Sequence, residues 1–438
     1  MRERFNALAA RLEASLKAGE ALLCNLSAER SDFVRFNKAL VRQAGTVEQA
    51  YLTLRLVRER RQASATVALA GNGDDEPLAL SALGKLRDSL AALPADPWLL
   101  INEAPHSSAT ERRGALVSAP DVVGQVLAAA RGQDLVGFYA GGTLYRGFAN
   151  SLGQRNWHEV DSFNFDWSLY RQGDQAVKTS YAGFDWAPDA FTATMSRAAA
   201  EVDLLALPRR TLEPGEYRAY LAPAALQEVL GMLSWGGFSA RSRVTKQSPL
   251  LLMEEGRTLS PKVSLAEDTA QGIGPAFQAQ GFLKPARVEL IHGGKLGQPL
   301  VSPRSAKEYG LATNGAGGGE SPESLDMAPG TLAEAEALRA LDRGLYISNL
   351  WYLNFSDRPA GRITGMTRFA TFWVEGGRIV APVTPMRFDD SIYRLLGTEL
   401  AALTSSAEML PDASTYGERS TASVRLPGAL LNAMMFTL

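Results

Sequence analysis

Cysteine and histidine are the scarcest reactive residues of this sequence. Its 438 residues include one cysteine, Cys24, and three histidines, His106, His158 and His292. A single cysteine cannot form a disulfide within the chain, so nothing indicates an oxidising compartment. The same scarcity excludes a cysteine cluster for zinc or iron–sulfur, and a histidine-rich zinc site would require distant residues to converge. We expect the three histidines to be surface or turn residues.

Neither sign of charge is in excess. The 45 Lys and Arg residues against 47 Asp and Glu residues leave a formal net charge of −2, which disfavours a face that neutralises nucleic-acid phosphates. No apolar run reaches the roughly 18–20 residues that span a bilayer. The charged N-terminal segment MRERFNALAARLEASLKAGEALL lacks the apolar core and cleavage site of a signal peptide. We therefore expect a cytoplasmic protein that binds neither nucleic acid nor membrane.

Helical and strand patterns are mixed along the chain. The N-terminal segment predicts an amphipathic helix, and Gly45 and the glycines at 71–73 predict turns between strands. The expected strands are 31–45, 46–61 and 62–71; the expected helices are 78–93 and 119–132; a linker is expected at 95–113.

The segment DSFNFDWSLY (161–170) is the clearest strand. Phe163, Phe165, Trp167 and Leu169 alternate with polar residues, and a period of two places them on one face. The turn at 171–175 predicts a hairpin with AVKTSYAGF. This aromatic face fits a half-buried sheet better than a platform for bases or sugars.

From about residue 211 the chain is rich in strand patterns. Residues 288–301 and 372–383 each carry a Gly-Gly pair between apolar runs, which predicts tight hairpins. The Gly-, Ser- and Pro-rich segment 310–330 predicts a mobile loop, a common place for ligands. The fold class is α+β with antiparallel sheets: α/β units at the N-terminus and a β-rich C-terminal domain. The expected domains are 1–113, 114–208 and 209–438.

Local catalytic motifs are absent. His158-Glu159 begins like a zinc-protease motif, but Ser162 stands where the second histidine should be. There is no GxxxxGK[ST] loop, GIGPAF lacks the third glycine of a dinucleotide fingerprint, and Met232 occupies the first glycine position of a G-x-S-x-G elbow around Ser234. Catalysis by dispersed residues stays open.

The segment LAPAALQEVLGMLSWGG (221–237) predicts a core helix. Pro223 suits a first turn, and Gly236-Gly237 suits an end. Four apolar residues follow at i, i+3, i+4 and i+7, typical of a buried stripe: Leu226, Val229, Leu230 and Leu233. This interpretation does not account for Gln227, Glu228 or Met232.

Those residues resemble a known pattern. LQEVLGML is similar to the zinc helix LHEAxGHG of the TldD/PmbA family, whose best-known members form the TldD–TldE metallopeptidase. Glu228 matches the glutamate of the HExxxH motif, and Gln227 and Met232 occupy the two histidine positions. Other similar segments extend over nearly the whole chain, among them RFNKALVRQAGTVEQAYLTLRLV, FANSLG and RITGMTRFATFWVEGGRIVAPV.

The resemblance implies a subunit of the TldE/PmbA type without its own zinc. A glutamine amide and a thioether are poor zinc ligands, and no cysteine follows Cys24 to supply the third TldD ligand. We expect no cofactor and no established catalytic residue, with Glu228 as the candidate remnant. The implied role is a pseudo-enzyme in a heteromeric TldD-type peptidase, acting in proteolysis or peptide maturation. Its implied partners are a peptide substrate and a TldD-like homologous subunit, or a second copy of itself.

Three alternatives remain. Glu228 without a zinc-bound water has nothing to activate in the usual way, so it can be an ordinary solvated or ion-paired helix residue. The chain can instead be a hydrolase or peptidase that acts on its own by another mechanism. It can also be a regulatory protein linked to DNA gyrase, because some relatives carry such names.

Overall fold

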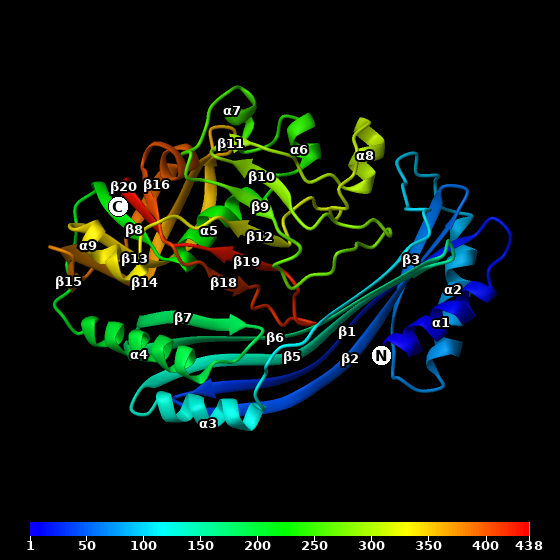
Figure 1. The fold of residues 1–438 in the computed structure, drawn as a ribbon, viewed down its shortest axis with the longest axis horizontal. Coiled ribbons are helices and arrows are strands. Elements are labelled where there is room, and N and C mark those ends of the chain that lie inside the picture. The colour runs from blue at the N-terminus through cyan, green and yellow to red at the C-terminus, as the bar shows by residue number, and fades with distance from the viewer. Residues whose placement is uncertain (438) are drawn as a thin grey trace.

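The computed structural model describes residues 1–437, which form three sheets with helices around them. The first sheet has the strand order β3-β2-β1-β5-β6-β4, with β7 also paired to β6. Its strands are β1 (Ala21–Asn37), β2 (Leu40–Arg58), β3 (Arg61–Ala68), β4 (Ser107–Arg112), β5 (Asp134–Asn150), β6 (Gln154–Gln172) and β7 (Gln175–Gly183). Its pairings are antiparallel except that of β4 with β6. In Figure 1 the long strands curve beneath the C-terminal half of the molecule.

Four helices accompany the first sheet. They are α1 (Arg2–Ala14), α2 (Asp75–Leu90), α3 (Ala119–Ala129) and α4 (Pro188–Leu204). Leu22 and Leu26 of β1 share a core with α1 and α2, whereas Val34 of the same strand joins the core of α3 and α4. Because side chains two residues apart along a strand share a face, one face of β1 serves both helix pairs.

The C-terminal half contains the other two sheets. The second sheet has the order β11-β10-β9-β12-β19-β18. Its strands are β9 (Leu265–Glu267), β10 (Val288–His292), β11 (Lys295–Leu296), β12 (Ser324–Met327), β18 (Glu408–Pro411) and β19 (Ser423–Leu426). The third sheet has the order β13-β8-β20-β16-β14-β15, with β17 paired to β20. Its strands are β8 (Gly215–Leu221), β13 (Gly344–Asp357), β14 (Arg362–Glu375), β15 (Arg378–Pro382), β16 (Arg387–Ser391), β17 (Leu400–Leu403) and β20 (Ala429–Phe436). Since β13 also pairs with β14, the third sheet closes on itself.

One helix lies at the centre of the C-terminal half. The apolar residues of α5 (Pro223–Ser234) belong to a single large core with residues from both C-terminal sheets. The remaining helical segments are short: α6 (Ala240–Val244), α7 (Leu251–Glu254), α8 (Pro303–Tyr309), η1 (Glu334–Glu336), α9 (Ala337–Leu341) and η2 (Arg394–Thr398).

A loop from the C-terminal half ties it to the first sheet. Residues 412–422 connect β18 to β19, and Arg419 within them is 4% exposed. Its guanidinium donates to the backbone oxygen and the hydroxyl of Ser162, both at 3.0 Å. Its backbone N–H donates to the buried Glu29 carboxylate at 3.3 Å. The loop therefore fastens the two halves of the chain together.

The structure confirms the α+β fold class and its largely antiparallel sheets. The hairpins predicted around the Gly-Gly pairs and at 161–183 are also confirmed. The domain boundaries predicted at residues 113 and 208 stay predictions. No helix within residues 1–437 is long and apolar enough to cross a membrane.

Three predictions of local secondary structure were wrong. Gly45 is not a turn but lies inside β2 opposite Phe33, and the turn falls at Lys38 and Ala39, both with positive φ. The predicted linker 95–113 contains β4. The predicted mobile loop 310–330 contains β12, a strand buried at every position. It also contains Glu320, whose carboxylate accepts backbone N–H groups of residues 241 and 302 at 2.9 and 2.8 Å.

Candidate functional site

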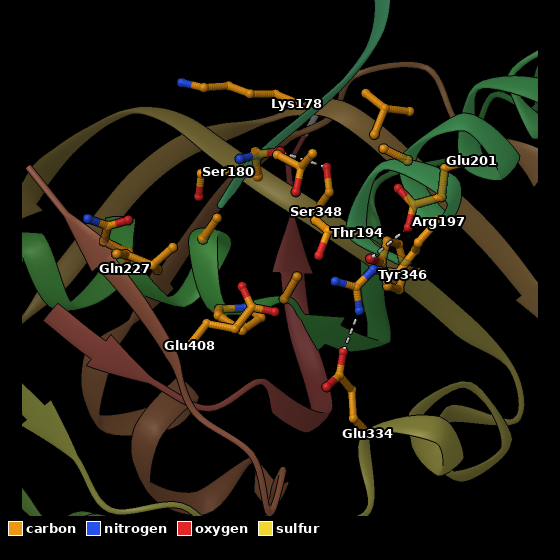
Figure 2. Close-up of a pocket in the computed structure, with 18 of the residues that line it drawn as sticks. Lys178, Ser180, Thr194, Arg197, Glu201, Gln227, Glu334, Tyr346, Ser348 and Glu408 are labelled. Carbon is orange, nitrogen blue, oxygen red and sulfur yellow. Dashed lines mark hydrogen bonds and ion pairs between the residues drawn. The ribbon is translucent and has the colours of Figure 1, made fainter. Parts of the chain in front are cut away.

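A cavity of about 780 Å³ lies between the first sheet and the C-terminal half. One wall comes from β6, β7 and α4; the other comes from β8, α5, β13, β18 and η1. Figure 2 shows how its polar side chains gather from these separate elements. The volume falls within the range of pockets that hold small-molecule ligands, roughly 300–1,000 Å³.

Helix α5 contributes Gln227 and Glu228 to this cavity. Pro223 begins the helix, and its predicted stripe of three leucines and one valine is fully buried, which confirms a core helix. Met232 is 3% exposed, belongs to the same core and does not line the cavity. Two residues five positions apart are rotated by roughly 140° around a helix, so Gln227 and Met232 lie on different sides of α5.

Glu228 faces the cavity without a partner. Its carboxylate makes no hydrogen bond or ion pair with any residue in 1–437. Although Glu228 is exposed, the surrounding walls still remove some of its water, which raises the pKa of its carboxyl. The nearby Lys178 ammonium opposes this shift. Such a group can bind a cation or exchange a proton with a ligand.

An ion pair and a half-buried carboxyl occupy the α4 side of the cavity. Arg197 donates to Glu334 at 2.8 Å, and the Tyr346 hydroxyl donates to Glu201 at 3.3 Å. Burial raises the pKa of Glu201 to about 7, against the opposing effect of Arg197. Glu201 therefore exchanges a proton near neutral pH, as a general acid or base must.

The strand β18 adds a further carboxylate, Glu408. Burial also raises the pKa of Glu408, and Arg197 opposes that change. No residue that the structure describes donates a hydrogen bond to the Glu408 carboxylate. Figure 2 places its carboxylate between Gln227 and Arg197.

The first sheet supplies the remaining polar wall. Asn164 and Asp166 of β6 and Lys178 and Ser180 of β7 line the cavity. Asn164 donates to Asp166 at 3.2 Å. The polar residues between the aromatic positions of β6 therefore face the cavity, while Phe165 and its aromatic neighbours form the core under α3 and α4.

Sequence reasoning found only part of this site. It identified Gln227 and Glu228 through the resemblance of α5 and missed Arg197, Glu201 and Glu408. These three residues belong to no motif, because they converge from α4 and β18, which are far apart along the chain. The alternation in 161–170 is the one sequence signal for Asp166, because the residues between the aromatic positions must share the opposite face of the strand.

The histidines take no part in the cavity. His158 is buried and its Nε2 lies 2.8 Å from the Ile273 carbonyl oxygen, so its predicted surface or turn position was wrong. His292 is exposed beside the Gly293 turn, as predicted. His106 is half-buried, with its Nδ1 3.2 Å from the Asn156 side-chain oxygen.

The donors on α5 do not fit zinc. They consist of one amide and one carboxylate, since the Met232 thioether is in the core, and zinc sites use at least three imidazole, thiolate or carboxylate ligands. Throughout residues 1–437, no three His, Cys, Asp or Glu side chains are grouped so that they could hold a metal ion.

Comparisons with known proteins converge on one family. A family model described as the PmbA/TldA metallopeptidase C-terminal domain matches residues 214–438, just over half of the chain. No curated protein sequence matches the chain significantly.

Solved structures share the fold over nearly the full length. TldE from Thermococcus kodakarensis has a TM-score of 0.80 at 15% identity and covers 99% of both chains. A proposed modulator of a DNA gyrase from Thermotoga maritima has a TM-score of 0.77 at 17% identity and covers 99% of this chain and 100% of its own. A similar protein from Bacteroides thetaiotaomicron has a TM-score of 0.75 at 15% identity and covers 99% and 98%.

Proposed function

Because the chain belongs to the PmbA/TldD metallopeptidase family, we propose that it is a metal-free subunit of the TldE type. In this role it binds peptide in its cavity and supports a homologous subunit that carries an intact HExxxH motif. Cleavage takes place at the partner's zinc, in proteolysis or peptide maturation. The proposal places the complex in the cytoplasm and assigns this chain no cofactor.

The donor set of α5 carries the proposal. The helix presents Gln227 and Glu228 to a cavity large enough for a ligand and keeps Met232 in the core. Zinc takes imidazole, thiolate or carboxylate ligands, and neither position 227 nor position 232 holds a histidine. The cavity nevertheless contains uncharged and charged hydrogen-bonding groups from both halves of the chain. Such groups can bind a peptide.

Subunit mixing tests the proposal. The chain is co-expressed with an HExxxH-bearing homologue from the same organism, and the purified species are assayed for subunit content, zinc by mass spectrometry and cleavage of an unfolded peptide. We expect a mixed complex with zinc in the homologue, cleavage by the complex, and neither zinc nor cleavage in this chain alone. Glu228→Gln in this chain should leave chemical turnover far less affected than loss of the homologue's motif glutamate.

The opposite outcome is equally clear. If this chain alone binds stoichiometric zinc and cleaves peptide, and Glu228→Gln abolishes that cleavage, the metal-free role is wrong. Glu213→Gln, a change at an exposed residue outside the cavity, controls for general effects of removing a carboxylate.

One observation favours a second candidate, a hydrolase that needs no metal. Burial raises the pKa of Glu201 to about 7 within the cavity, where it accepts the Tyr346 hydroxyl, so one carboxyl that can exchange a proton near neutral pH is present. Peptide cleavage by the metal-stripped chain that disappears in Glu201→Gln would support this candidate. Regulation linked to DNA gyrase has no corresponding observation, because structural likeness at 15–17% identity concerns the fold alone.

A further inference from the structure

We propose that the cavity selects a cationic group on the bound peptide: a lysine or arginine side chain, or the ammonium of a free N-terminus. The inference rests on the proposed peptide-binding role and names the chemistry that this cavity recognises.

The first argument is the imbalance of charge in the lining. Five carboxylates line the cavity against two cations: Asp166, Glu201, Glu228, Glu334 and Glu408 against Lys178 and Arg197. One of the two cations is already engaged, because Arg197 pairs with Glu334. Clefts lined by one sign of charge concentrate ligands of the opposite sign.

The second argument concerns two side chains of the cavity, Tyr220 and Glu408, that have no hydrogen-bond partner within the described chain. Tyr220 lines the cavity, is 4% exposed and stacks on Tyr346 with ring centroids 5.7 Å apart. Its hydroxyl makes no hydrogen bond to any residue between 1 and 437. Glu408 lacks a partner in the same way. Buried polar groups are normally hydrogen-bonded, so the Tyr220 hydroxyl, like the half-buried Glu408 carboxylate, is free to bond a ligand.

Donor count then favours a cation over a neutral group. An ammonium carries three donors and a guanidinium five, enough to satisfy the Glu408 carboxylate and the Tyr220 hydroxyl oxygen together. A hydrogen bond between charged partners is roughly twice as strong as a neutral one. An anionic ligand would instead meet unpaired carboxylates at Glu408 and Glu228.

Lys178, the cavity cation that has no ion pair within the described residues, lies to one side of Glu408. In Figure 2 the Lys178 side chain points away from Glu408, and within the described chain Lys178 forms no ion pair. The Lys178 Nζ lies over the Phe369 ring, 6.0 Å from the ring centroid. Lys178 therefore leaves the anionic character at Glu408 unneutralised.

Calorimetric titration of the full-length chain with matched peptides tests the inference. The probes are Gly-Ser-Xaa-Ser-Gly peptides, acetylated and amidated, with Lys, Arg, Gln or Glu at the central position, together with a Gln peptide that has a free N-terminus. We expect the Lys or Arg peptide, or the free-amine peptide, to bind about tenfold more tightly than the blocked Gln peptide, and the Glu peptide to bind most weakly. The peptide that binds more tightly than the blocked Gln peptide shows whether the cavity recognises a side-chain cation or the N-terminal ammonium.

Variants locate the recognition. Glu408→Gln and, separately, Glu228→Gln should reduce the preference for the cationic peptide about tenfold while the blocked Gln peptide binds as before. Tyr220→Phe should weaken the cationic peptide by a smaller factor. Glu289→Gln, at an exposed residue outside the cavity, is the matched control and should change nothing. Unchanged melting temperatures establish that each variant is folded.

Equal affinity for all peptides, or a cation preference that survives both Glu408→Gln and Glu228→Gln, would overturn the inference. This failure differs from a failure of the proposed function. If a mixed complex forms and cleaves peptides of every charge equally well, only the proposed cation preference is wrong. If the chain binds lysine peptides but forms no complex with an HExxxH-bearing homologue, only the proposed subunit role is wrong.

Discussion

Replacement of Glu201 by glutamine should change how the stability of the protein depends on pH. Glutamine retains an oxygen that can accept the Tyr346 hydroxyl, as Glu201 does at 3.3 Å, but it cannot ionise. Burial raises the Glu201 pKa from the ordinary 4.5 to about 7 in the folded protein. The folded state therefore prefers the protonated carboxyl more strongly than the unfolded state does.

The direction of the pH effect follows from linkage. When the pKa of a carboxyl is higher in the folded state than in the unfolded state, its protonation stabilises the folded state. This stabilisation is complete below the unfolded-state pKa and is lost as the pH rises through the folded-state pKa. For Glu201 the loss occurs between about pH 4.5 and 7. A shift of this size corresponds to at most about 3 kcal/mol, and for a chain of this length that is a change of about 3 °C in Tm.

Thermal unfolding of the wild type and Glu201→Gln at intervals from pH 4 to pH 9 measures the effect. The variant should gain about 3 °C relative to the wild type between pH 4.5 and pH 8, with no further gain above that. Asp203→Asn removes an exposed carboxyl of the same helix and should follow the wild type. A difference in Tm between Glu201→Gln and the wild type that stays constant over this range would refute the burial argument.

Three further predictions concern the core, the loop and the zinc helix. Leu230→Ala empties a fully buried position of α5 and should lower the free energy of unfolding by about 2–5 kcal/mol in denaturant titration; a loss below about 1 kcal/mol would contradict the packing. Arg419→Met removes the guanidinium hydrogen bonds to Ser162 and keeps the backbone bond to Glu29, so it should lower the free energy of unfolding by about 1.5–3 kcal/mol and expose loop 412–422 to limited proteolysis; an unchanged rate of cleavage would show that other contacts hold the loop. The double change Gln227→His and Met232→His should not create a tight zinc site by equilibrium dialysis, because position 232 is in the core; stoichiometric zinc would refute that placement.

Local patterns predicted much of the secondary structure. The two Gly-Gly hairpins and the 161–183 hairpin were predictable because turn geometry and period-two alternation are properties of neighbouring residues. The stripe on α5 was predictable for the same reason. Gly45 shows the limit of such patterns: the sequence cannot reveal that β2 continues through a glycine when its partner Phe33 lies on another strand.

Tertiary partners decided what local patterns could not. Segment 310–330 has the composition of a loop, but β12 within it pairs with β9 and β19, and its neighbour Glu320 accepts buried backbone donors. The cavity is the extreme case, since Arg197, Glu201 and Glu408 meet only after the two halves of the chain pack together. The resemblance of α5 identified one wall of the site, and no pattern in the sequence indicated the others.

Strand β6 joins the core and the cavity through a single backbone. Its odd-numbered aromatic residues such as Phe165 pack beneath α3 and α4, and its even-numbered Asn164 and Asp166 face the ligand space. Because a shift of one residue exchanges the two faces of a strand, a single insertion or deletion within β6 would place charge in the core and aromatic rings in the cavity. Point substitutions at Asn164 and Asp166 avoid that exchange. Substitution at Asn164 or Asp166 can therefore change the ligand preference of this chain, whereas the core behind β6 does not tolerate a change in the length of the strand.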